Sequence, residues 1–332
     1  MRIVSLIASG TEIVCALGRE RILVGRSHEC DYPPSVSALP ACTRPRFDAS
    51  GSSREIDEAV KSVLRRSMAV DVVGAAAGAS KVAGSVPPEM GAGDALSVYE
   101  VFTERLRELQ PTHIVTQAQC DVCAVSLKDV ERAVRELAGC NPEVISLQPN
   151  SLNDIWDDIS RVASSLGVDE YGERLVASLR ARMQGIKELA ATIGRRPRVA
   201  CIEWADPLMA AGNWTPELIE MAGGENLLGT AGEHSPAISF EDLAATDPDV
   251  IVIAPCGFPL ARIREDVPVL AAHPGWKDLS AVRHAQVFLA DGNQYFNRPG
   301  PRVVETVKIL AEILHPDVFA FGHEGSAWER AA

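Results

Sequence analysis

The chain has 332 residues, of which 46% are hydrophobic and 23% charged, so it is long enough for about two domains and has the composition of a folded protein. Its 32 Lys and Arg residues against 45 Asp and Glu residues give a formal net charge of −13, which argues against nucleic acid or anionic membranes as partners. No apolar run is long enough to span a membrane. The N-terminus does not have the pattern of a signal peptide, since polar residues interrupt its apolar stretch at 9–12, so we expect a cytoplasmic protein with reduced cysteines.

Short β-branched runs alternate with amphipathic segments along the first 150 residues, which is typical of an α/β fold with mostly parallel sheets. Strands are predicted at 3–6, 22–25, 114–116 and 144–147, and helices at 9–17, 97–109 and 127–137. Ser9 and Glu12 have the spacing of a capping box for the first helix. The Ala- and Gly-rich stretch 69–93 is interpreted as a surface insertion, with a lid over a cleft as the alternative.

Residues 151–195 have apolar residues at helical spacing and no strand signal, which predicts linking helices, one of them within 170–192 and long enough to bridge two lobes. A second α/β lobe is predicted over 196–316, followed by a tail at 317–332 that is loose from Gly322. In this lobe strands are predicted at 199–202, 250–254 and 287–289, and helices at 216–222, 240–245 and 303–314. Ser239 and Asp242 are predicted as the capping pair of the helix 240–245. The predicted architecture is therefore two Rossmann-like lobes with mostly parallel sheets joined by a long helix.

Polar, aromatic and sulfur-bearing residues follow the predicted strands of both lobes, where ligands bind in open parallel sheets. In the first lobe these residues are His28, Glu29, Cys30, Gln117, Cys120 and Cys123. In the second lobe they are Glu203, Trp204, Cys256, Phe258, Tyr295, Phe296 and Arg298. This layout predicts a ligand cleft between the two lobes.

Each of these groups has two interpretations. Cys120 and Cys123 form a single C-x-x-C, and with Cys30, Cys256 and His28 they either share a metal ion or are unrelated loop residues. The aromatic residues Trp204, Trp214, Tyr295 and Phe296 either face a ligand or belong to the core. Glu203 either pairs locally, or it orients a ligand or acts as an acid or base. Nucleotide-binding loops, the nucleophile elbow of hydrolases and the H-E-x-x-H zinc motif do not occur.

Several motifs together resemble class III periplasmic binding proteins for cobalamin, haem and ferric siderophores, and in particular the branch called cobalamin-binding protein. The resemblance covers about residues 1–316 and lies in 2–18, the H-E-C-D-Y-P motif at 28–33, 116–125, 203–204, 222–229, 247–252, 255–258 and 291–296. It implies two α/β lobes joined by one long helix, with the ligand in the cleft. The stretch 69–93 is an insertion relative to the family, and without a leader docking to a transporter permease is not expected.

Three functions follow as expectations. The first is a protein that binds a corrinoid (cobalamin) or related metal chelate. The second is an enzyme in which Glu203 is the acid or base and a cluster of cysteines and one histidine either holds iron or zinc or provides a thiolate. At least three of the five residues of this cluster are expected within about 8 Å of one another, namely His28, Cys30, Cys120, Cys123 and Cys256. The third is a cytoplasmic sensor or chaperone for a cofactor. In the binding hypothesis the ligand contacts come from His28, Glu29, Gln117, Glu203, Trp204, Trp214, Phe258, Tyr295, Phe296 and Arg298.

Overall fold

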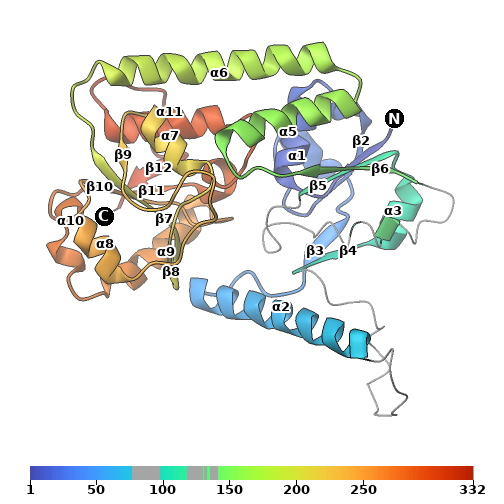
Figure 1. The fold of residues 1–332 in the computed structure, drawn as a ribbon, viewed down its shortest axis with the longest axis horizontal. Coiled ribbons are helices and arrows are strands. Elements are labelled where there is room, and N and C mark those ends of the chain that lie inside the picture. Colours follow the sequence, from blue (N-terminus) through green and yellow to red (C-terminus); the bar gives the residue numbers. More distant parts are fainter. Residues whose placement is uncertain (77–97, 118–129, 131–132, 135–140, 332) are drawn as a thin grey trace. The chain divides into compact units, whose positions relative to one another are not determined.

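The computed structural model describes residues 1–76, 98–117, 130, 133–134 and 141–331 (Figure 1). The chain divides into two compact units, Met1–Leu147 and Gln148–Ala332, each with its own sheet and core. Each unit is described by itself below. The α/β class with parallel sheets and a long helix, predicted from the sequence, is confirmed.

The first unit is built on a four-stranded parallel sheet with the order β2-β1-β5-β6. All four strands lie where the β-branched runs predict them. They are β1 (Ile3–Ser5), β2 (Leu23–Arg26), β5 (His113–Gln117) and β6 (Glu143–Leu147). Helix α1 (Ala8–Ala16) and a short 3-10 turn connect β1 to β2. Because the strands are parallel, their carboxyl ends, and the residues that follow them, lie along one edge of this sheet.

The predicted capping box of α1 is wrong. The helix begins at Ala8 with Ile7 as N-cap, and no side chain caps it. Ser9 and Glu12 are both buried inside the helix instead. The reason is the short connection: the Leu6 amide still donates to the Val115 carbonyl at 2.8 Å, so Leu6 and Ile7 alone separate the strand from the helix.

The prediction of one helix over 97–109 is also wrong in its first part. Residues Tyr99–Val101 form strand β4, which pairs antiparallel with β3 (Thr43–Pro45), and helix α3 (Thr103–Leu109) follows. A β-branched and aromatic run prefers a strand when a partner strand is available, which local periodicity does not reveal. A further helix, α2 (Ser53–Ala76), was not predicted, and it includes the first residues of the stretch 69–93. Most of that stretch and most of the predicted helix 127–137 lie outside the described residues.

The second unit begins with two helices, α5 (Leu152–Ser165) and α6 (Asp169–Ala191), as the apolar spacing predicts. Ser151 and Asp154 form a capping box at the start of α5. The 23 residues of α6 make a helix of about 34 Å. It packs on α5, on α7 (Thr215–Met221) and on α11 (Val303–Leu314), which all belong to this unit. Within the described ranges, no helix has the length and apolarity that crossing a membrane requires.

A mixed sheet with the order β12-β11-β10-β7-β8 forms the centre of the second unit. Its parallel strands are β7 (Arg198–Ala205), β10 (Val250–Ile253) and β11 (Val287–Ala290), with the short β9 (Glu225–Asn226) beside β7. Helices lie on both sides of the sheet: α7 and α11 on one, and α8 (Phe240–Thr246), α9 (Leu260–Ala271) and α10 (Ser280–Arg283) on the other (Figure 1). The predicted caps Ser239 and Asp242 form a complete capping box for α8, whereas α9 was not predicted.

The end of the chain is not a loose tail. Residues Trp328–Arg330 form β12, which pairs antiparallel with β11, and the Trp328 ring packs edge-on against Phe288 at 5.7 Å. The antiparallel strand β8 (Leu208–Ala210) closes the other edge beside β7. Unlike β1, this segment contains no β-branched residue, so it has little local strand signal; its partner strand β11 and the buried tryptophan determine it.

Candidate functional site

Three loops of the second unit meet at the carboxyl end of its sheet. They comprise the end of β7 with the residue after it and the loops after β10 and β11, and we call residues 203–206, 254–258 and 291–298 the C-terminal loop cluster. The loops are joined to one another by hydrogen bonds: the Cys256 amide donates to the Glu203 carbonyl at 3.2 Å, and the Gly292 and Asn293 amides donate to the Phe258 carbonyl at 3.1 and 3.2 Å. The residues predicted from the strand ends are therefore brought together by backbone contacts.

Gly292 allows two of these loops to approach each other. A Cβ atom at this position would lie 2.0 Å from the Pro255 carbonyl oxygen and 2.9 Å from the Ala254 oxygen. Both contacts are shorter than van der Waals distances and involve backbone atoms, which cannot move aside without displacing the loop. A glycine at the start of the 291–298 loop is thus required for the cluster to close.

Trp204 and Phe258 form the aromatic part of the cluster. Their ring centroids are 5.1 Å apart with the rings tilted by 46°, and the guanidinium carbon of Arg262 lies 4.4 Å from the Phe258 centroid. The Trp204 indole donates to the Asp206 carbonyl at 3.1 Å. Trp204 is half-buried, whereas the other four tryptophans of the chain are buried. Its indole is therefore the tryptophan ring best placed to contact a ligand.

Several other predicted contact residues have buried side chains. Trp214 is 6% exposed, and its indole donates to the carbonyl of Phe296, which is itself 2% exposed. Phe258 and Gln117 are buried as well. Burial of this degree favours packing roles, because a side chain that is enclosed by the protein has little area left for a ligand. Their predicted contact with a ligand stays a prediction.

Two arginine side chains contact residues of the loop 291–298. Arg298 is 4% exposed and donates to the Asn293 side-chain oxygen at 3.1 Å. Arg302 was not among the predicted contacts; its guanidinium carbon lies 5.3 Å from the ring centroid of the half-buried Tyr295, and it donates to Gln294 at 3.3 Å. The R-P-G-P-R spacing after the strand is the sequence signal that places both cations near this loop.

Glu203 connects the cluster to the loop before α8. Its carboxylate accepts a hydrogen bond from the Ser235 hydroxyl at 2.8 Å, and the same hydroxyl accepts one from the Gly212 amide at 3.0 Å. Burial, followed by the nearby Glu203 charge, raises the pKa of the Cys201 thiol, so this cysteine stays protonated in the core. These contacts favour the local pairing of Glu203, and the acid or base role remains a prediction.

In the first unit a second polar group follows β2, which we call the His28 cluster: Ser27, His28, Glu29, Thr43 and Tyr99. Thr43, on the ribbon of β3 and β4, has its hydroxyl 2.8 Å from His28 Nδ1 and 3.0 Å from the His28 amide. The Tyr99 hydroxyl donates to Glu29 at 2.9 Å, and the His28 and Tyr99 ring centroids are 5.2 Å apart. Nδ1 is thus engaged by the Thr43 hydroxyl, and Nε2 lies 3.9 Å from the Glu29 carboxylate.

Burial, with the Arg26 cation as the second cause, lowers the pKa of His28 from 6.5 to about 4. Between these pH values the unfolded chain binds a proton at this site that the folded protein does not. The His28 contribution to stability is therefore complete above about pH 6.5 and is lost as the pH falls toward about 4.

We expect His28→Asn to remove this part of the pH dependence. The stability difference between wild type and variant should shrink by up to about 2 kcal/mol from neutral to acidic pH, a value reduced for partial exposure. Urea denaturation at pH values across that window measures it. His284→Asn, which changes an exposed histidine, is the control, and its free energy of unfolding should vary with pH as that of wild type does. If the free energy of unfolding of His28→Asn also varies with pH as in wild type, the prediction is contradicted.

The predicted cysteine and histidine metal site has no support in the part of the chain that the structure describes. Cys30 is 1% exposed, and its sulfur accepts the Thr11 hydroxyl at 3.0 Å, which is a core environment. Cys256 lies in the other unit and is half-buried. Among the described residues, no group of three or more His, Cys, Asp or Glu is arranged to hold a metal ion. Cys120 and Cys123 lie outside these residues, so the cluster and the enzyme alternative built on it stay predictions.

The known proteins that this chain is compared with below are all named as binding proteins. The chain is 25% identical over 192 residues to an uncharacterised ABC transporter substrate-binding lipoprotein, YvrC, of Bacillus subtilis, an alignment that covers 56% of this chain and 58% of that protein. It is 24% identical over 169 residues to a vitamin B12-binding protein of Vibrio cholerae, covering 50% of this chain and 58% of that protein. The chain thus spans under two thirds of the length of these curated relatives.

The fold is also similar to that of a periplasmic haem-binding protein, RhuT, from Roseiflexus sp. RS-1. The TM-score is 0.65 at 23% identity, and the match covers 96% of this chain and 98% of the other. The family model described as periplasmic binding protein matches residues 3–293, which is most of the chain. The family resemblance seen in the sequence motifs is therefore confirmed, and this chain belongs to the periplasmic binding protein family.

Proposed function

We propose that this chain is a substrate-binding protein whose ligand is a corrinoid or a related flat metal chelate such as haem. The observation that carries the proposal is the composition of the C-terminal loop cluster, which combines the partly exposed Trp204 indole with Tyr295 beneath the Arg302 guanidinium. Aromatic rings pack on the apolar face of a macrocycle, and arginine and amide groups bind the acid or amide side chains at its rim.

The names of related proteins support the same ligand class. One curated relative is named a vitamin B12-binding protein and one structural neighbour a haem-binding protein. Both ligands are planar tetrapyrrole-type chelates of a transition metal, so the two names agree on shape although they differ in the metal. A ligand between the two units and a cytoplasmic location, both expected from the sequence, stay predictions.

His28 is the residue of the first unit best suited to such a ligand. Its lowered pKa leaves the imidazole neutral at neutral pH, and a neutral imidazole is the form that binds iron or cobalt. The Thr43 hydroxyl beside Nδ1 orients the ring in the manner of an outer-shell partner. The residues present thus fit a chelated metal, with His28 Nε2 as the donor atom.

Titration of the purified protein with cyanocobalamin, dicyanocobinamide and haemin tests the proposal. We expect saturable binding of at least one of them with a Kd of about 1 μM or tighter, followed by tryptophan fluorescence and by the absorption spectrum of the ligand. A haem spectrum that changes in His28→Ala would assign the metal ligand. Absence of saturation with all three compounds at about 100 μM would overturn the proposal.

A further inference from the structure

The end of the chain is attached directly to the loop 291–298. Residues 319–330, which we call the C-terminal segment, include β12, and the Ala327 carbonyl accepts the Asp291 amide at 2.8 Å. Trp328 is the register partner of Ala290, the last residue of β11. Asp291 in turn caps the turn Gly292–Phe296 by accepting the Gln294 amide at 2.7 Å. Movement of the C-terminal segment would therefore move the start of the loop.

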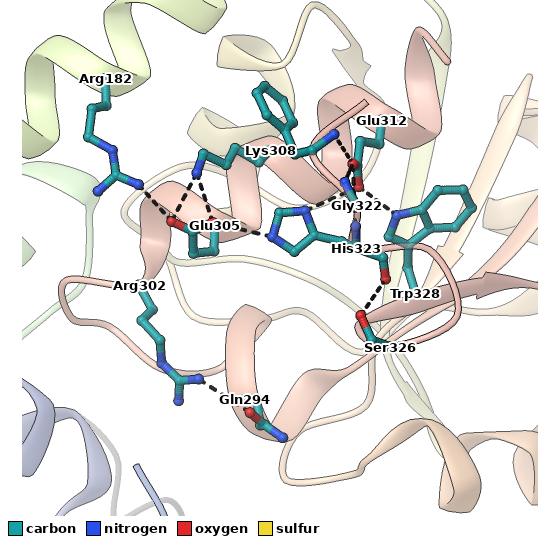
Figure 2. A network of polar contacts seen from close by, with 11 residues as sticks. Arg182, Gln294, Arg302, Glu305, Lys308, Glu312, Gly322, His323, Ser326 and Trp328 are labelled. Atoms are coloured by element: carbon teal, nitrogen blue, oxygen red, sulfur yellow. Dashed lines mark hydrogen bonds and ion pairs between the residues drawn. The ribbon is translucent and has the colours of Figure 1, made fainter. Parts of the chain in front are cut away.

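Glu312 of α11 anchors this segment through a buried carboxylate. One carboxylate oxygen accepts the backbone amides of Phe321 and Gly322, the latter at 2.6 Å. The other accepts the Trp328 indole at 2.9 Å and lies 3.2 Å from His323 Nδ1 (Figure 2). Every one of these donors comes from residues 321–328, so a single side chain binds this part of the segment to α11, in addition to the pairing of β12 with β11.

His323 extends the anchor toward the loop. Its Nε2 lies 3.2 Å from Glu305 Oε2, which also binds Lys308 at 3.0 Å (Figure 2). The other oxygen of Glu305 binds Arg182 of α6 at 2.7 Å (Figure 2). The imidazole is thus held at both nitrogens between two carboxylates of α11. Its ring lies edge-on to Tyr295, with centroids 6.3 Å apart and an angle of 82° between the planes.

Tyr295 is held from two further directions. The Thr306 hydroxyl of α11 donates to the Tyr295 carbonyl at 3.0 Å, and Arg302 lies over its ring at 5.3 Å. The His323 ring completes this set of contacts from the C-terminal segment. The Tyr295 side chain is therefore contacted by a residue 28 positions later in the sequence, which Glu305 and Glu312 of α11 hold in place.

We propose that the C-terminal segment is a built-in clamp for the loop 291–298, with His323 as the residue that positions Tyr295 for the ligand. This inference rests on the proposed function, since the loop is part of the proposed ligand site. A side chain that is already held in its bound position loses less conformational freedom on binding, so the clamp raises affinity without touching the ligand.

The test compares His323→Gln and His323→Ala with Glu329→Gln in the full chain. Glu329 of β12 pairs with Arg264 of α9 at 2.6 Å, so its variant alters the same segment at a site away from Tyr295. We expect both His323 variants to weaken cyanocobalamin or haemin binding at least about fivefold. We also expect faster hydrogen exchange of the backbone amides over 291–296 in both variants. The control variant should bind within about twofold of wild type and keep the exchange rates of that loop.

Two readouts separate this inference from the proposed function. If wild type binds a ligand and the His323 variants bind it equally well, or if exchange over 291–296 is unchanged in them, the clamp is overturned. If wild type binds none of the ligands but exchange over 291–296 rises only in the His323 variants, the clamp is supported and the proposed function fails. The Gln variant keeps a polar side chain of similar size, so we expect it to remain folded for the exchange measurement.

Discussion

Replacing Glu312 by alanine is expected to lower the free energy of unfolding by about 3–5 kcal/mol, the largest loss that we predict for one side chain. The carboxylate is 4% exposed and accepts hydrogen bonds from the Gly322 amide and the Trp328 indole, among others. The substitution leaves these donors without an acceptor, and the segment that carries β12 loses its anchor. Urea denaturation followed by circular dichroism measures the loss.

Two variants make this result specific. Glu312→Gln keeps the shape of the side chain and one acceptor oxygen, so its loss should be about half as large. Glu324→Ala removes an exposed acid of the same segment and should change stability by no more than about 0.5 kcal/mol. A loss below about 1 kcal/mol for Glu312→Ala would mean that the segment is held by β-strand pairing alone.

Replacing Trp204 by alanine is expected to weaken ligand binding by about 1–3 kcal/mol, or roughly 5- to 150-fold in Kd. The expected loss reflects the indole area buried against the ligand together with its packing on Phe258 at 5.1 Å. Since the other tryptophans are buried, most of the ligand-induced quenching should also disappear in this variant. Trp204→Phe keeps an aromatic face and should retain more of the affinity.

Phe240→Ala is the matched control for Trp204→Ala. Phe240 is also half-buried, and it stacks on His273 with centroids 4.9 Å apart. His273 follows the carboxyl end of α9, whereas the C-terminal loop cluster precedes that 12-residue helix, so the control lies about 18 Å away along the helix. It should reduce stability but leave Kd unchanged. Equal affinity of Trp204→Ala and wild type would remove Trp204 from the site.

Much of the site could be located from strand ends alone. In a parallel sheet, the residues after each strand must reach the same edge, so Glu203, Cys256 and Tyr295 were predicted to lie at one edge before any contact was known. The backbone contacts between their loops have this arrangement. What the strand ends do not specify is the direction of each side chain, which is why Trp204 is partly exposed while Trp214 and Phe296 are buried.

The sequence by itself determined the elements whose signal is local. Apolar spacing predicted α5, α6 and α11, β-branched runs predicted the parallel strands, and Ser239 with Asp242 predicted a cap, because these features depend on neighbours within one or two turns. Only the tertiary structure decided where short segments find partners across the chain. Tyr99–Val101 becomes a strand beside β3, and Trp328–Arg330 becomes one beside β11, since the pairing partner is more than 35 residues away in each case. The burial of Glu312 and its contacts to residues 321–328 are likewise long-range, and the stability of a buried carboxylate depends on donors that no local pattern reveals.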